Sequence, residues 1–180
     1  MPCPYTLHYT LHPCAKHKGM QAQRGEGLHT RRAHWRDFEI VAALVAQCGA
    51  GELRAERRTL RRFRHIVNDL GNDLYLAFVG ETLVGLVHIV YVRELVAPRR
   101  AEISCMMVAP HAASQEVTEA LVALAFRRAR KRDCRVLVYR SVNGSGAIHG
   151  TLSAAGFRLV GQWYLASVPE ETGSREQEEH

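Results

Sequence analysis

Apolar and polar residues alternate or recur with a clear period along most of this chain. From Leu28 to Ala33 they alternate, which predicts a short strand. From Asp37 to Cys48 the apolar residues recur at helical spacing, and Asp37 is the candidate N-cap of that helix. A further helix is expected over 56–70, where one face is apolar and the other is rich in arginine.

The rest of the pattern is richer in strands. Two strands over 73–95 flank Gly80-Glu81, a dipeptide that suits a hairpin turn. They are followed by the strand Ala101–Val108, a helix over 117–133, a strand over 135–142, a helix over 146–157 and a last strand over 158–168. The order β-α-α-β-β-β-α-β-α-β predicts an α/β domain with a mixed sheet.

The composition changes at both ends of this pattern. Residues 1–27 contain several Pro, Gly and His residues without a sustained period, so we expect a flexible N-terminal extension. Residues 169–180 are polar and acidic, which predicts a disordered tail. The chain is therefore interpreted as one domain over 28–168 with two short extensions.

The cysteines and the lack of long apolar runs bear on the compartment. No apolar run approaches the ~20 residues of a membrane span, and the N-terminus lacks a signal-peptide pattern, so we expect a cytoplasmic protein without membrane contact. Five cysteines without a C-x-x-C pair fit reduced thiols better than disulfides. The Cys and His residues of 3–17 match no standard zinc spacing, so no metal is expected.

The charge of the chain is unevenly distributed. The total is +6, and the acidic tail means that the remainder is more basic still. A basic body is compatible with an anionic ligand such as CoA, an acidic protein or nucleic acid, whereas most of these residues are expected to form a solvated, arginine-rich surface. Nucleic acid is the least favoured, because the arginines of 54–64 are interrupted by no aromatic residue except Phe63, which fits the apolar face.

The stretch 101–121 holds the most specific motif. It is expected to form a strand, a turn at Val108-Ala109-Pro110, a polar loop and a helix. A loop that enters a helix exposes unpaired N–H groups at the positive end of the helix dipole, where pyrophosphate commonly binds.

This stretch resembles the acetyl-CoA motif of the GNAT superfamily of N-acetyltransferases, V-x-P-x-x-[Arg/Gln]-x-x-Gly-x-[Gly/Ala] before a helix. Val108 and Pro110 keep the frame, whereas Ala113, Glu116 and Thr118 replace the Arg/Gln and the two glycines. Two further matches are Arg32-Ala33 with Asp37, and Ala155-Gly156-Phe157. The resemblance covers about 28–168 and implies a GNAT-like mixed sheet with helices on both faces.

The resemblance also implies acetyl-CoA or another acyl-CoA as co-substrate. Two central strands, here 101–108 and 135–142, would part, and pantetheine would pair with the backbone of the first. Residues that would contact the cofactor are Cys105, Met106, Met107, Val108, Ala113, Ser114, Gln115, Glu116, Val117, Thr118 and Asn143. The glycine-free loop brings Cβ atoms and the charge of Glu116 to the place of the pyrophosphate, which predicts weak binding.

Acyl transfer to an amine needs a base and an acid. Glu102 stands where some family members carry a catalytic glutamate in an A-E-I sequence; alternatively it pairs with Arg99 or Arg100. The position of the usual tyrosine acid is Leu152. Tyr139 and His149 are the candidate replacements, and the pKa of a histidine suits proton transfer.

Two functions follow from these residues. The first is a divergent GNAT-type N-acyltransferase that moves an acetyl or other acyl group from acyl-CoA to the amine of a small molecule or protein. The second is a catalytically inactive GNAT-fold module that binds a protein partner, another ligand or a second copy of itself.

Overall fold

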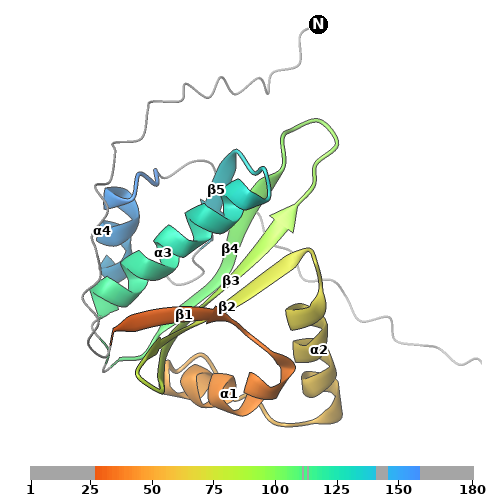
Figure 1. Cartoon of the computed structure of the whole chain (residues 1–180), viewed down its shortest axis with the longest axis vertical. Coiled ribbons are helices and arrows are strands. Elements are labelled where there is room, and N and C mark those ends of the chain that lie inside the picture. The colour runs from red at the N-terminus through yellow and green to blue at the C-terminus, as the bar shows by residue number, and fades with distance from the viewer. Residues whose placement is uncertain (1–26, 111, 113, 141–145, 159–180) are drawn as a thin grey trace, which may run out of the picture.

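The computed structural model describes residues 27–110, 112, 114–140 and 146–158 (Figure 1). The expected order of strands and helices is confirmed over this part of the chain, and the strand expected over 158–168 lies outside it, apart from Arg158. The strands are β1 (Leu28–Arg32), β2 (Asn72–Val79), β3 (Thr82–Val92), β4 (Arg100–Val108) and β5 (Val136–Tyr139); the helices are α1 (Phe38–Gln47), α2 (Arg57–Asn68), α3 (Ser114–Lys131) and α4 (Gly146–Ala154).

The described strands form one mixed sheet in the order β1-β2-β3-β4-β5. Neighbours from β1 to β4 are antiparallel, whereas β5 runs parallel to β4 after the crossover through α3. The expected mixed α/β fold is therefore correct. The hairpin turn at Gly80-Glu81 is also confirmed, since β2 ends at Val79 and β3 begins at Thr82.

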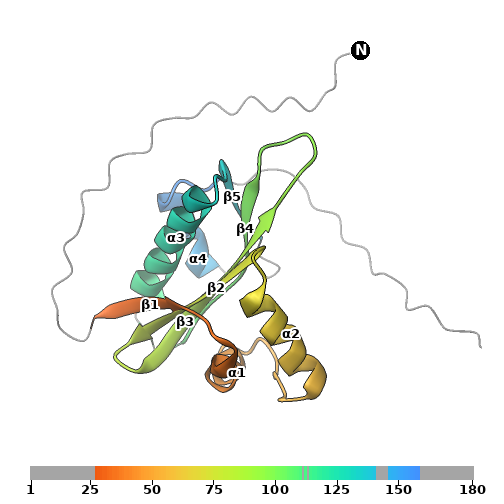
Figure 2. The same cartoon turned by 45° about the vertical axis from the view of Figure 1, so that its right-hand side comes forward.

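Helices cover both faces of the sheet, as the resemblance implied (Figure 2). On one face, α1 and α2 pack Leu44 and Phe63 against Leu76 and Leu86 of the sheet. On the other face, α3 and α4 form a second core with the opposite side chains of the same strands. The alternation along each strand divides the residues of the sheet between the two cores.

Gly85 of β3 allows α3 to lie close to the sheet. A Cβ at this position would lie 2.9 Å from Val117 Cγ1 and 3.0 Å from the backbone oxygen of Met107. Real Cβ atoms essentially never approach another atom this closely, so only glycine fits without a shift. The close contact fixes the first turn of α3 beside the end of β4.

The start of α1 differs from the prediction. Asp37 precedes the helix but makes no side-chain cap hydrogen bond to it. Its carboxylate instead accepts two hydrogen bonds from Arg31 and one from the His34 backbone, each 2.7 Å long. Residues Trp35–Asp37 form a 3-10 turn whose N-cap is His34. A bidentate arginine therefore competes successfully for the carboxylate that the sequence assigned to the helix end.

Candidate functional site

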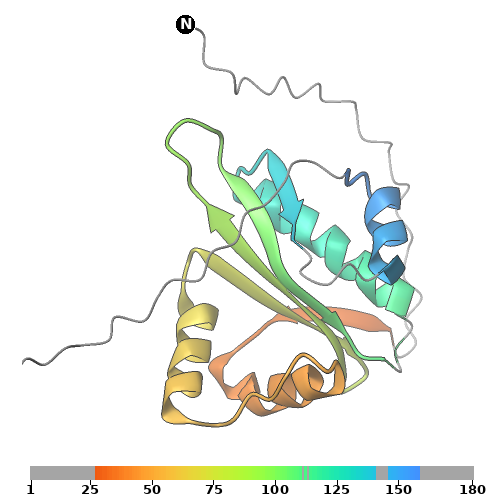
Figure 3. The same ribbon diagram turned by 180° about the vertical axis from the view of Figure 1, so that it is seen from behind.

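Strands β4 and β5 part near the middle of β4. Their pairing runs from Arg100 opposite Val136 to Ile103 opposite Tyr139, and no later pair is formed between them. The rest of β4, Ser104–Val108, continues past the end of β5 (Figure 3). Within the described residues this stretch therefore has a backbone edge without a paired strand. An extended ligand can add to such an edge by backbone hydrogen bonding.

The four β4 residues expected to contact pantetheine alternate between the two faces. Cys105 and Met107 pack toward the α1/α2 core, whereas Met106 and Val108 pack toward the α3/α4 core. Their side chains are thus engaged in packing, which leaves recognition along this edge to the backbone.

Glu102 is buried just before the strands part. Only 2% of the residue is exposed. The neighbours Ala101 and Ile103 belong to the α3/α4 core, so the side chain of Glu102 points to the other face of the sheet. Arg140, which directly follows β5, donates from Nε and Nη2 to its Oε1. Among the described residues, Oε2 has no hydrogen-bond partner.

Glu102 is paired with an arginine, but the expectation that this arginine is Arg99 or Arg100 is wrong. Arg99 donates to the backbone oxygen of Arg132 at 3.1 Å, and Arg100 pairs with Glu94. The true partner, Arg140, becomes a neighbour only through the parallel pairing of β4 and β5.

Of the two proposed replacements for the tyrosine acid, Tyr139 does not lie beside Glu102. Tyr139 pairs with Ile103 and packs against the α3/α4 core, on the face opposite Glu102. Leu152, at the usual tyrosine position, is buried in the same core. His149 lies on α4, and its side chain is outside the described residues, as are Ala113 and Asn143.

Several side chains in the first two turns of α3 are buried or hydrogen-bond within the helix. Val117 and Thr118 are buried, and the Thr118 hydroxyl donates to the backbone oxygen of Ser114. Gln115 donates to Glu119 at 3.0 Å. Ser114, Gln115 and Glu116 are exposed, so an anion approaching this turn would meet the Glu116 carboxylate.

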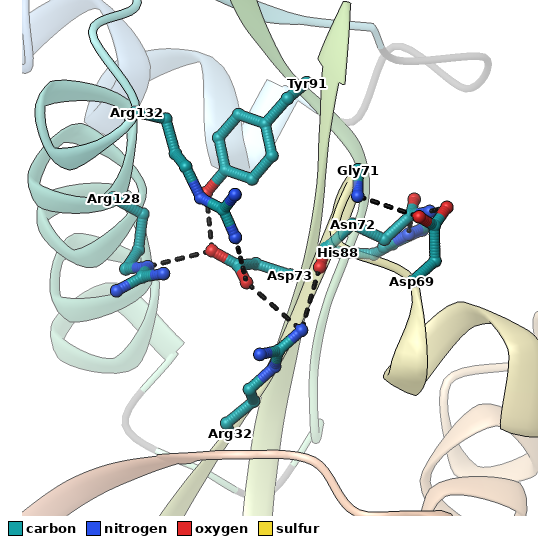
Figure 4. Close-up of polar contacts among 9 residues, drawn as sticks. All are labelled: Arg32, Asp69, Gly71, Asn72, Asp73, His88, Tyr91, Arg128 and Arg132. Atoms are coloured by element: carbon teal, nitrogen blue, oxygen red, sulfur yellow. Dashed lines mark hydrogen bonds and ion pairs between the residues drawn. The ribbon is translucent and has the colours of Figure 1, made fainter.

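A hydrogen-bonded network on the α1/α2 face was missed by the sequence reasoning. The Ser104 hydroxyl lies 2.7 Å from His88 Nδ1, and His88 Nε2 lies 2.9 Å from Asn72 Oδ1. The Asn72 amide in turn donates to Asp69, which Figure 4 shows beside Asn72 and His88. Burial lowers the pKa of His88. The one signal in the sequence was a histidine within the apolar run of β3.

Comparison with known families matches residues 30–149 to the model described as the acetyltransferase (GNAT) family. The chain belongs to the GNAT family. Two thirds of its sequence lies within the matched range, which includes β4, the parting of β4 and β5, and α3. Among curated proteins, no sequence matches this chain.

Solved structures of the same fold include several acetyltransferases. A transcriptional regulator from Bacillus halodurans C-125 has a TM-score of 0.70 and 22% identity over 79% of this chain and 100% of its own. A ribosomal-protein-alanine N-acetyltransferase from Brucella melitensis biovar Abortus 2308 has a TM-score of 0.64 and 17% identity over 79% of this chain and 100% of its own. AAC(6')-Iy was solved in complex with the bisubstrate analog CoA-S-monomethyl-acetylneamine. It has a TM-score of 0.66 and 15% identity over 79% of this chain and 99% of its own.

The thiols near the β4 edge of this GNAT domain are in their neutral form at neutral pH. Cys48 donates through Sγ to the Val108 backbone oxygen at 3.4 Å. Burial raises the pKa of Cys48, and burial together with the nearby Cys48 raises the pKa of Cys105. A protonated thiol is a poorer nucleophile than a thiolate, so the raised pKa lowers the reactivity of both cysteines.

A separate ionic cluster ties this GNAT domain together on its α3 face (Figure 4). Asp73 is fully buried and accepts hydrogen bonds from Tyr91 at 2.6 Å and from Arg128 Nε at 2.8 Å. Arg32 and Arg132 lie 3.5 Å and 3.8 Å from its Oδ1. The cluster joins β1, β2 and β3 to the C-terminal end of α3.

The described residues contain no candidate membrane span and no candidate metal site. None of their helices combines the length and apolar character needed to cross a membrane. Nor do their His, Cys, Asp and Glu side chains come together in any group of three that is able to hold a metal ion.

Proposed function

We propose that this GNAT protein transfers an acetyl or other acyl group from acyl-CoA to an amine. The observation that carries the proposal is the parting of β4 and β5 at Ile103–Tyr139, directly beside the buried carboxylate of Glu102. A thioester held along Cys105–Val108 would end next to that carboxylate. The acceptor would be the amine of a small molecule or of a protein.

Each part of this site has a defined role in the proposal. The backbone edge of Ser104–Val108 pairs with the amide groups of pantetheine. The exposed first turn of α3 faces the pyrophosphate through its N–H groups. Glu102, directly or through a water molecule, removes a proton from the incoming ammonium so that the nitrogen lone pair is free to attack. Arg140 holds the carboxylate in place from the end of β5.

Structural relatives agree with this assignment as far as their descriptions go. One of them holds a CoA-containing bisubstrate analog, and another is described as acting on a ribosomal protein. Their sequence identity to this chain is below 25%, so they support the fold, and the acyl donor and acceptor stay a proposal.

The reaction is proposed to take place in the cytoplasm. Among the described residues, Cys48, Cys105 and Cys134 are free thiols, which is the state that a reducing compartment maintains. Fractionation of cells that express the protein, with a cytoplasmic marker enzyme alongside, tests this assignment.

Calorimetric titration with CoA and with acetyl-CoA, followed by an assay of thiol release with a panel of amines, tests the proposed activity. The expected result is binding of both and amine-dependent release of CoA. Thiol release that is independent of the amine would indicate hydrolysis instead, and the absence of both binding and release would overturn the proposal.

The second candidate is a GNAT-fold binding module without transfer activity. It is favoured by one feature of the first turn of α3, the exposed Glu116 carboxylate, which repels an anion. Such a module would bind a protein partner or a second copy of itself. It predicts no CoA binding in the calorimeter, together with a defined complex or dimer by light scattering.

A further inference from the structure

Ser104, His88, Asn72 and Asp69 form a hydrogen-bonded chain, here called the Ser104 network. It begins at an exposed hydroxyl on β4, passes through a half-buried imidazole on β3 and an amide on β2, and ends on a carboxylate in the turn between α2 and β2. The network therefore joins side chains of β4, β3 and β2 with one from the turn that directly precedes β2.

The direction of each hydrogen bond in the Ser104 network follows from the carboxylate of Asp69 at its end. A carboxylate accepts, so the Asn72 amide turns its nitrogen to Asp69 and its oxygen to His88. The oxygen accepts from His88 Nε2–H, which leaves a lone pair on Nδ1. That lone pair faces the Ser104 hydroxyl at 2.7 Å, whereas the His88 backbone oxygen is farther away at 3.4 Å. Asp69 is itself held by the Gly71 N–H at 2.8 Å.

The position of Ser104 places this network at the proposed reaction centre. Ile103 is the last residue of β4 that pairs with β5, and Ser104 follows it at the bulge where the β3–β4 register shifts. Its side chain is exposed, and His88, its hydrogen-bond partner, shares the face of the sheet to which Glu102 points. A thioester along Cys105–Val108 would therefore have the Ser104 hydroxyl at its reactive end.

Acyl transfer leaves one proton movement unassigned. The acceptor loses two protons, one from the ammonium before attack and one from nitrogen after the C–N bond forms. Glu102 is the proposed acceptor of the first. The departing thiolate needs a proton, and the usual tyrosine position holds the buried Leu152.

We propose that Ser104 and His88 carry this second proton from the nitrogen to the thiolate. The Ser104 hydroxyl accepts the proton from the nitrogen of the tetrahedral intermediate while it gives its own proton to His88 Nδ1. The C–S bond then breaks, the imidazolium returns a proton through Ser104, and the CoA thiolate takes it up. The products are the amide and CoA thiol, and one proton, taken by Glu102, goes to solvent.

Asn72 and Asp69 are positioning residues in this scheme. They fix the tautomer of His88, because an Nε2 hydrogen bonded to Asn72 leaves Nδ1 free to accept. The charged groups that bear on the imidazole are Asp69 behind Asn72, and Glu102 with Arg140 on the same face. Since burial lowers the pKa of His88, its neutral form is the resting state at neutral pH.

The test rests on the proposed function and uses the full chain with acetyl-CoA and an amine that the wild type accepts. Ser104→Ala and His88→Gln are each expected to lower kcat by ~10²–10⁴ with little change in KM for acetyl-CoA. The double variant is expected to lose no more than the worse single variant, because the two groups act as one unit. Exposed residues elsewhere supply the matched controls, Ser153→Ala and His65→Gln, which are expected to keep wild-type rates.

The pH profile separates a proton carrier from a structural role. In the wild type, kcat should fall toward acid pH as His88 becomes protonated, and the part of this fall that is due to His88 should be absent in His88→Gln, which leaves only the part due to Glu102. If His88→Gln fails to fold, the kcat of Ser104→Ala alone tests the proposal. The Ser104 side chain is exposed, so its truncation leaves no cavity.

The outcomes distinguish this inference from the function on which it rests. A wild type without amine-dependent thiol release overturns the proposed activity and the proton path with it. Suppose that the wild type is active, that both variants keep kcat within a few-fold of its value, and that His88→Gln shows the same fall in kcat toward acid pH. This result would overturn only the proposed role of the Ser104 network.

Discussion

Arg140 donates two hydrogen bonds to one oxygen of Glu102 and leaves the other oxygen buried without a partner in the described part of the chain. The arginine side chain is half exposed, whereas the glutamate side chain is 3% exposed. A buried carboxylate oxygen without a partner is costly to maintain. In the proposed mechanism this oxygen, beside the parting strands, is the one that a water molecule or the incoming ammonium would contact.

Replacement of Glu102 by Gln tests its role as the base. The amide keeps the shape and removes the basicity, so kcat should fall by ~10²–10⁴ in the proposed enzyme. The free energy of unfolding should fall by only about 1 kcal/mol, because the half-exposed Arg140 can regain water. Steady-state kinetics and urea unfolding measure the two effects.

The matched control for this variant is Glu94→Gln, which breaks another Glu–Arg pair, with Arg100, beyond the end of β3. It should leave kcat unchanged. An active wild type whose kcat survives Glu102→Gln would show that the base lies elsewhere.

The charge at the entrance of α3 offers a gain-of-affinity test. Glu116→Gln keeps the helix and removes the carboxylate that faces an approaching pyrophosphate, so CoA should bind about 2–5-fold tighter at low salt. The gain should shrink at 0.5 M salt through screening. Calorimetry measures the dissociation constants.

Glu119→Gln is the control for this charge effect. Glu119 lies one turn further along α3 and is held by Gln115, so its removal should matter less to the ligand. An equal gain in both variants would indicate a diffuse surface charge effect and no specific phosphate position at the first turn.

The order of elements could be predicted because each is encoded locally. Alternation marks the strands, helical spacing marks α1 and α2, and Gly80-Glu81 marks the hairpin. The pairing of Glu102 with Arg140 could not be found in this way, since 38 residues separate the two and only the crossover through α3 brings them together. Arg99 and Arg100 lie nearer in the sequence, but the expectation that one of them pairs with Glu102 is wrong.

The Ser104 network was missed for a similar reason. His88 lies in an apolar run that reads as a core strand, and Asn72 and Ser104 are common residues at strand ends and bulges. Their contact depends on the register of three strands, including the shift between His88 and Ile89. A one-residue slip would turn each side chain to the other face of the sheet.

The Arg31–Asp37 pair predicts a pH dependence of stability. Hydrogen bonding from Arg31 is the main cause that lowers the pKa of Asp37 below its usual value. The stabilisation is therefore present above the pKa of the unfolded chain, ~3.9, and is lost as the pH falls through the lower pKa of the folded state. Asp37→Asn should cost about 1 kcal/mol at pH 7, since Arg31 is partly exposed.

Thermal or urea unfolding of wild type and Asp37→Asn between pH 7 and pH 2 measures this effect. The two curves should converge at the acid end of the range. Glu39→Gln, in the exposed first turn of α1, should run close to the wild type throughout. A constant gap between wild type and Asp37→Asn at all pH values would show that the carboxylate charge is irrelevant.

The Asp73 cluster predicts a larger loss of stability that leaves the chemistry untouched. Asp73→Asn removes the one carboxylate shared by Arg32, Arg128 and Arg132, so three guanidinium groups stay together without a counter-charge. The free energy of unfolding should fall by about 3 kcal/mol. Tyr91→Phe removes a single hydrogen bond to the same carboxylate and should cost about 1 kcal/mol.

Urea unfolding of both variants, with Glu81→Gln in the exposed β2–β3 turn as the control, measures the difference. Burial and the hydrogen bond to Asp73 raise the pKa of Tyr91, so its hydroxyl stays a donor throughout the range of the experiment. CoA affinity in folded Asp73→Asn should match the wild type, because the cluster lies on the far half of α3 from Ser114. A variant that keeps full stability but loses CoA binding would instead make Asp73 part of the ligand site.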